Sequence, residues 1–299
     1  MTRGPEVPAA GGTTWLDAVG RRLGGPAEIV RRTALAGGYA TVGVERVELR
    51  VGEREVSVVV KPADPVEVAA MRAIGVVEGL EVPRLLAVDP LVLSWVDGAP
   101  VGEGDAVPPE IWRTLARVHR HWFRKRPRGI PVVDAGWWAR LCEATLLPLR
   151  GARGRTGDPV FERTAELVAG WAGDPRVRAA LALLPKTLCH GDPNRANLLG
   201  RSVIDWGNAR VAPAGLDLAV LRAQGPVDLA AYREEFAEGP LEGVEREWAW
   251  AHVHVQYLGF AADHLGAARV AEMTAEVEGA LSRLEAALRQ VRPLRQVRR

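Results

Sequence analysis

Residues 187–207 read TLCHGDPNRANLLGRSVIDWG and are the most informative stretch of this 299-residue chain. A two-residue turn at 200–201 would join two short strands and would pair Asn197 with Ile204. That register places the side chain of Asn197 roughly 5 to 8 Å from that of Asp205. An amide oxygen and a carboxylate at the open end of a hairpin are hard oxygen ligands of the kind that Mg²⁺ takes.

Two further residues complete a set of groups for phosphoryl transfer. Asp192 lies on the loop that leads into the hairpin, so it reaches the same mouth as Asn197. Lys61 ends an apolar strand in a separate part of the chain. In this reaction metal ions neutralise the phosphate charge, a Lys holds the phosphates, and an Asp orients the attacking hydroxyl and takes its proton.

The first part of the chain reads as a small β-rich lobe. Alternating apolar residues predict a hairpin over 41–61, and a helix with Pro at its start is predicted over Pro65–Ile74. Short apolar runs predict strands over Val82–Val88 and Leu91–Val96. The sequence Asp-Gly-Ala-Pro at 97–100 breaks the chain, so we place the domain boundary there, with lobes 1–97 and 98–299.

The second part of the chain reads as mostly helical. One helix follows Pro108-Pro109, and the last clear helix is predicted to end before a solvated Arg-rich tail over 289–299. Their apolar faces are Ile111, Leu115, Val118 and Trp122 for the first helix, and Val277, Leu281, Leu284 and Leu288 for the last.

Composition limits the partners and the compartment. A net charge of +2 gives no strong field toward nucleic acid or an acidic membrane. Residues 120–128 mix bases with aromatics, but a helix C-terminus also attracts such charge, and we favour that interpretation. Cys142 and Cys189 form no paired motif, and neither a spanning segment nor a signal peptide is visible. We therefore expect a cytoplasmic protein with neither nucleic-acid nor membrane partners.

Two motifs carry a resemblance to a known family. Residues 190–197 and 204–207 resemble the H-G-D-x-x-x-x-N and I-D-[FW]-G signatures of the aminoglycoside phosphotransferase and choline kinase-like group, which shares the protein-kinase fold. Residues 115–119 resemble the family's L-A-x-L-H helix, and 216–219 resemble its D-L-A segment. Over roughly residues 30–290, the resemblance implies a bilobal α+β fold, with an antiparallel N-terminal sheet lobe carrying one main helix and a larger helical C-terminal lobe.

The resemblance also implies roles for individual residues. Asp192 would be the catalytic Asp, Asn197 and Asp205 would be metal ligands, and Lys61 would contact the α- and β-phosphates while pairing with Glu67. The simpler interpretations are an edge-strand lysine for Lys61, a helix-dipole residue for Glu67, and turn-forming side chains for the other three. Because Asp192, Asn197 and Asp205 together have the spacing of the family's motifs, we favour the functional interpretation of these three residues.

Further nucleotide contacts are expected from backbone groups. Gly37 and Gly38 lie in a glycine-bearing approach to the first predicted strand, where the backbone can come close to a ligand. Ser94 and Val96 belong to the connector between lobes, whose backbone would receive the adenine edge. His190 would brace the catalytic loop.

The chain also departs from its relatives. Trp206 stands where many kinases carry Phe, and Asn194 occupies the place of the catalytic-loop Lys of protein kinases. Arg195 is a candidate to supply that positive charge. Asp217 is expected to be a structural partner and not a catalytic group.

The acceptor is left open by the sequence. Trp250, His254 and Tyr257 share one helix face, which would line an acceptor pocket or pack in the core. An acidic cluster would suit a polycation, although nearby arginines dilute it, and the aromatic residues suit a macrolide or nucleoside equally. The cluster consists of Glu234, Glu235, Glu238, Glu242, Glu245 and Glu247.

The sequence thus predicts a Mg²⁺-requiring kinase that uses ATP or GTP. Its acceptor would be a hydroxyl of an aminoglycoside-like antibiotic or of another small metabolite. The alternatives are a catalytically silent nucleotide-binding module of the same fold and, more weakly, a protein kinase.

Overall fold

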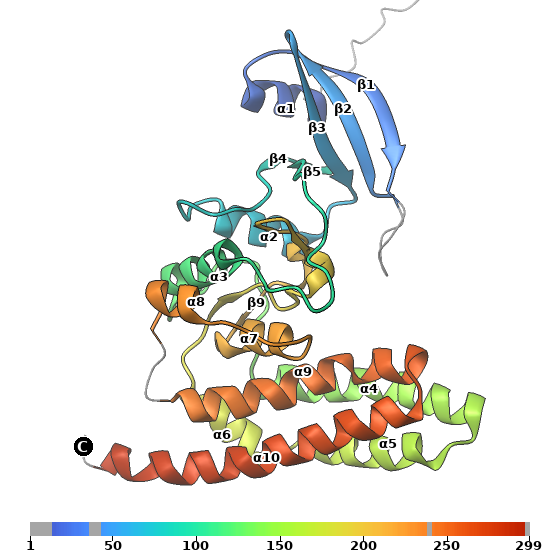
Figure 1. Cartoon of the computed structure of the whole chain (residues 1–299), viewed down its shortest axis with the longest axis vertical. Coiled ribbons are helices and arrows are strands. Elements are labelled where there is room, and N and C mark those ends of the chain that lie inside the picture. The colour runs from blue at the N-terminus through green and yellow to red at the C-terminus, as the bar shows by residue number, and fades with distance from the viewer. Residues whose placement is uncertain (1–13, 36–42, 238–240, 297–299) are drawn as a thin grey trace, which may run out of the picture.

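The computed structural model describes residues 14–35, 43–237 and 241–296, and it has the predicted bilobal α+β architecture (Figure 1). Gly37 and Gly38 lie outside the described residues. The N-terminal lobe holds a five-stranded antiparallel sheet in the order β1-β2-β3-β5-β4. Its strands are β1 (Ala27–Ala34), β2 (Glu45–Val51), β3 (Arg54–Lys61), β4 (Leu85–Val88) and β5 (Leu91–Ser94).

The predicted hairpin is formed by β2 and β3, which turn at Gly52 with Val51 opposite Arg54. Helix α1 (Trp15–Leu23) packs on the sheet, and Val19 joins the buried valines and leucines of β2 and β3. Neither α1 nor β1 was predicted. β1 is almost wholly exposed, and its apolar residues do not alternate with polar ones. The first strand of the predicted hairpin is β2, and most of the glycine-bearing segment that precedes it, 36–42, lies outside the described residues.

Helix α2 (Pro65–Ile74) has the predicted bounds. Asp64 caps it by accepting the backbone N–H of Glu67 at 2.8 Å, and Pro65 fills the first helical position, where no N–H is needed. The strands β4 and β5 lie within the two short apolar runs. Beyond Ser94, the N–H of Trp95 still donates to the carbonyl of Ser57 on β3 at 3.2 Å.

The C-terminal lobe is mostly helical. Its helices are α3 (Pro109–Trp122), α4 (Ala135–Thr156), α5 (Pro159–Trp171), α6 (Pro175–Leu183), α7 (Gly215–Arg222), α8 (Ala230–Glu235), α9 (Glu242–His264) and α10 (Ala267–Gln296). Helices α4, α5, α9 and α10 lie side by side at the bottom of Figure 1. Because α10 runs to Gln296, the prediction of a tail from 289 is wrong for most of that segment. Within the described ranges, every helix is too short or too polar to cross a membrane.

A shared hydrophobic core joins the two lobes. Met71 of α2 and Leu91 of β5 are buried together with Leu115 of α3 and with Leu198 and Trp206 from the stretch that carries the motifs. Each such fully buried side chain stabilises the fold by about 1.5–3 kcal/mol, whereas exposed ion pairs contribute about 1 kcal/mol or less. Apolar packing, rather than surface charge, therefore sets how the lobes meet.

His252 of α9 generates a prediction about pH. Its ring is fully buried between Trp138 and Trp248, and neither ring nitrogen has a hydrogen-bond partner among the described residues. Burial, with a smaller effect of the Arg210 charge, lowers the pKa of His252 to about 3. Between that value and about 6.5 the unfolded chain binds one more proton, so the free energy of unfolding falls as the pH falls.

We expect His252→Phe to remove this acid sensitivity. When the pH is lowered from 7.5 to 5.0, the free energy of unfolding should fall by about 2 kcal/mol more in the wild type than in His252→Phe. Urea unfolding at the two pH values measures the difference. Equal losses in both proteins would show that His252 is not held neutral in the fold.

Candidate active site

The motif stretch folds as a tight ribbon of β7 (Leu198–Leu199) and β8 (Ser202–Val203). Leu198 faces Val203, and the N–H of Ile204 donates to the carbonyl of Asn197 at 2.9 Å, so the predicted register is confirmed. Two short 3₁₀ turns flank the ribbon, η1 (Arg195–Asn197) before it and η2 (Trp206–Asn208) after it.

Asp217 of α7 holds the loop that precedes the ribbon. It is fully buried, and its carboxylate accepts the backbone N–H groups of His190 and Gly191, each at 2.8 Å, and faces Nε2 of His119 at 3.0 Å. Burial would raise the pKa of Asp217, but its hydrogen bonds with His119 and with the backbone N–H of Gly191 outweigh burial and lower that pKa. Asp217 is thus the structural partner that the sequence suggested.

The loop itself requires a glycine and a neutral histidine. Gly191 has φ +84°, and a Cβ there would lie 2.1 Å from the carbonyl oxygen of Asn208. Nδ1 of His190 accepts the N–H of Asp192, so Nε2 carries the proton and donates to the carbonyl of Ile204 at 2.8 Å. His190 therefore ties the loop to the far strand of the ribbon.

The Asp192 carboxylate lies at the centre of this arrangement and is half-buried. Asn194 donates to Oδ1 at 3.1 Å and Asn208 donates to Oδ2 at 3.4 Å. The hydroxyl of Tyr257, on α9, also donates to Oδ1. Sequence reasoning placed Tyr257 on a helix face but had no signal for this contact, since the two residues lie far apart in the chain.

Lys61 brings the N-terminal lobe to the ribbon. Its Nζ lies 2.8 Å from Glu67 Oε1 and 3.2 Å from Asp205 Oδ1. Burial opposes the charge on Lys61, but the attraction of Glu67 and Asp205 outweighs it and raises the pKa of Lys61. Burial also raises the pKa of Glu67, and the adjacent ammonium offsets only part of that rise.

Asn197 and Asp205 present oxygen atoms that suit a divalent cation. Nδ2 of Asn197 donates to the backbone carbonyl of Asp192 at 3.0 Å, so the amide oxygen takes no part in that bond. Asp205 has the left-handed backbone (φ 59°), and its side chain is 49% exposed. An amide oxygen and an accessible carboxylate are both ligand types that Mg²⁺ takes.

The two connector residues differ in their surroundings. Ser94 is the last residue of β5, and both its N–H and its hydroxyl oxygen are hydrogen-bonded to the backbone of Arg84, at 2.9 and 2.8 Å. Val96 lies just beyond the strand. Further along, the segment at 99–101 pairs with the ribbon, because the N–H of Val101 donates to the carbonyl of Leu198.

Arg195 does not supply the positive charge that was considered for it. Its guanidinium is buried and donates to the backbone carbonyls of Gly102 and Asp105. Gln224 accepts the Arg195 backbone N–H at 2.9 Å. Arg195 therefore ties the segment 102–105 to the loop that carries Asp192.

The acidic cluster is largely neutralised. Glu234 and Glu235 form ion pairs with arginines of α3, and Glu247 pairs with Arg246 and Arg283. Glu245 accepts the N–H of Gly215. Glu238 lies outside the described residues. These four glutamates therefore already have partners within the fold.

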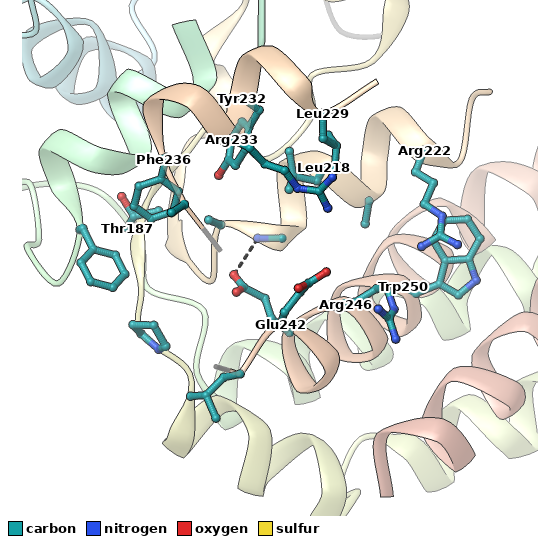
Figure 2. A pocket seen from close by; sticks show the side chains of 18 of the residues that line it. Thr187, Leu218, Arg222, Leu229, Tyr232, Arg233, Phe236, Glu242, Arg246 and Trp250 are labelled. Carbon is teal, nitrogen blue, oxygen red and sulfur yellow. Dashed lines mark hydrogen bonds between the residues drawn. The ribbon is translucent and has the colours of Figure 1, made fainter. Parts of the chain in front are cut away.

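A cavity of about 760 Å³ lies between α7, α8 and the start of α9. Figure 2 shows Tyr232, Arg233, Glu242 and Trp250 around it. Among the described residues that line the cavity there is no motif residue from 190–197 or 204–207, and Tyr257 is not among them either. Trp250 therefore belongs to this cavity, while Tyr257, on the same helix, belongs to the candidate site.

Comparisons with known proteins agree with this geometry. A sequence model of the phosphotransferase enzyme family matches residues 45–254. The choline kinase of Cryptosporidium parvum Iowa II has a TM-score of 0.53 at 9% identity, covering 90% of each chain. A choline/ethanolamine kinase family protein from Mesorhizobium loti has a TM-score of 0.54 at 18% identity, covering 87% of this chain and 92% of that one. At such identities the likeness is one of fold, and no curated protein sequence matches the chain.

The Lys61–Glu67 pair generates a stability prediction. Lys61→Met leaves the Glu67 carboxylate buried without its cation, so we expect a loss of about 3–5 kcal/mol in the free energy of unfolding at pH 7. Lys61→Met combined with Glu67→Leu should lose less, because the orphaned charge is gone. Urea unfolding measures both.

The matched control is Lys125→Met, since Lys125 is exposed and its ammonium donates to the backbone carbonyl of His121, one helical turn earlier. We expect it to change the free energy of unfolding by about 0.5 kcal/mol or less. If Lys61→Met loses no more free energy of unfolding than Lys125→Met, the Lys61–Glu67 ion pair does not stabilise the fold.

Proposed function

This chain belongs to the phosphotransferase enzyme family, and we propose that it transfers the γ-phosphoryl group of ATP or GTP to a hydroxyl group of a small molecule. One observation carries the proposal: a half-buried carboxylate, Asp192, lies beside a ribbon with two oxygen ligands, Asn197 and Asp205, and a lysine from the other lobe reaches the second of them. Phosphoryl transfer needs this combination of a base, cation ligands and a fixed ammonium.

In the proposed reaction, Asp192 accepts the proton of the acceptor hydroxyl. Lys61 holds the α- and β-phosphates, and Glu67 keeps its ammonium in place. Asn197 and Asp205 would hold Mg²⁺, which when bound neutralises charge on the β- and γ-phosphates. Since Ser94 is committed to Arg84, the backbone of Val96 is the better candidate of the two connector residues for contact with the base.

The acceptor is an aminoglycoside-like antibiotic, with a role in resistance, or another small metabolite. Partnered glutamates are a poor match for a polycation, because each carboxylate would have to exchange an existing partner for the substrate. A less highly charged metabolite is therefore the better supported of the two. Partners such as nucleic acid or a membrane are not part of the proposal.

The proposal is tested by incubating the protein with Mg²⁺, ATP or GTP and a panel of antibiotics and hydroxylated metabolites. Thermal shift identifies ligands, and mass spectrometry then detects an acceptor heavier by one phosphoryl group. Nucleotide binding without transfer to any acceptor would favour the alternative of a catalytically silent module.

Asp192→Ala should lower kcat by about 100-fold or more, the usual contribution of a general base, while nucleotide affinity stays close to that of the wild type. Asp205→Ala should instead weaken nucleotide binding in the presence of Mg²⁺ and leave metal-free binding less affected. Turnover assays and calorimetry separate the two effects. Full activity of Asp192→Ala would refute the role given to Asp192.

A further inference from the structure

Helix α9 touches the catalytic loop through two consecutive residues. Gln256 Nε2 donates to the carbonyl of Gly191 at 3.1 Å, and the hydroxyl of Tyr257 donates to Asp192 Oδ1. Neither residue lies in a sequence motif. The loop that carries the proposed base is therefore held from outside by a helix of the C-terminal bundle.

The two oxygens of the Asp192 carboxylate are unequally occupied. Oδ1 accepts hydrogen bonds from Tyr257 and Asn194, whereas Oδ2 accepts one from Asn208, at 3.4 Å. A carboxylate oxygen has two lone-pair positions, so donors among the described residues fill both positions of Oδ1 and leave one position of Oδ2 for a further donor. The acceptor hydroxyl of the proposed reaction needs such a position.

We infer that Tyr257 is a positioning residue: by filling Oδ1 together with Asn194, it fixes the Asp192 carboxylate and directs the acceptor hydroxyl to Oδ2. This role rests on the proposed function. As the acceptor oxygen bonds to the γ-phosphorus, its proton passes to Oδ2. The bond from that phosphorus to the bridging oxygen breaks, and the electron pair leaves with the nucleoside diphosphate.

The surroundings of Tyr257 suit a permanent donor. Burial, followed by the negative charge of Asp192, raises the pKa of Tyr257 above its usual range, so its proton is retained. Arg210 fixes the neighbouring groups, because Nη1 donates to Gln256 at 3.2 Å and Nε donates to the carbonyl of Asn208 at 3.0 Å. One buried guanidinium thus ties α9 to the turn that carries the Oδ2 donor.

The test is Tyr257→Phe, which removes only the hydroxyl. With ATP, Mg²⁺ and any acceptor found in the screen, or water as the acceptor, we expect kcat to fall by roughly 10- to 100-fold, the effect of losing one hydrogen bond to a charged group. KM for ATP should stay within about twofold of the wild type, since Tyr257 does not touch the groups assigned to the nucleotide. A smaller folded fraction would also lower the apparent kcat without changing KM, so kcat is expressed per folded protein, with the folded fraction taken from the unfolding curve.

Thr274→Val is the matched control. Thr274 is a buried hydroxyl on α10 that bonds to Thr164 and to the carbonyl of Val270, remote from the ribbon. The Thr274→Val variant should have a lower free energy of unfolding and an unchanged kcat. An unchanged kcat in Tyr257→Phe would overturn the positioning role, and a raised kcat would show that the hydroxyl merely occupies the acceptor position.

A second measurement needs no turnover. Tyr257→Phe and Asp192→Ala should be non-additive in urea unfolding, by about fivefold or more in the equilibrium constant, because the two side chains share one bond. If the two substitutions are additive and the wild type transfers phosphate, the role of Tyr257 is overturned and the proposed function stands. If they are non-additive but the wild type phosphorylates neither water nor any acceptor, the proposed function fails.

Discussion

The ammonium of Lys61 is the point on which the arrangement of the candidate site depends. It contacts Glu67 from α2 and Asp205 from the ribbon, so one positive charge joins carboxylates from two lobes. A buried carboxylate such as Glu67 is costly without a cation. The shared apolar core brings α2 and the ribbon together, and the charge then selects which side chains meet within that contact.

A second constraint acts on the loop that carries Asp192, the proposed base, where little freedom is left to the backbone. Asp217 accepts the N–H groups of two successive residues, His190 binds across the ribbon, and a side chain at position 191 would clash with Asn208. α9 adds contacts from a distant part of the chain. Such a framework holds a carboxylate in one orientation before any substrate arrives, which lowers the reorganisation needed during the reaction.

Local patterns predicted much of this structure. The hairpin, α2 and the ribbon register follow from alternation, helix-start chemistry and a two-residue turn. The exposed strand β1 could not be predicted, because its polar residues carry no periodicity. Likewise, the Tyr257 contact and the backbone binding of Arg195 depend on tertiary packing between segments far apart in the sequence. The Arg-rich end of α10 was misjudged because charge was taken as a sign of a loose tail, whereas arginine is a good helix former.

We propose that the nucleotide phosphates, the cation and the acceptor bind together beside Asp192, Asn197 and Asp205. A crystal structure with Mg²⁺ and a non-hydrolysable ATP analogue tests this arrangement most directly. We expect a cation bound by Asn197 and Asp205, Lys61 on the α- and β-phosphates with Glu67 still beside it, and the γ-phosphate facing Asp192. A nucleotide bound elsewhere, or a cation bound by other residues, would contradict the shared site.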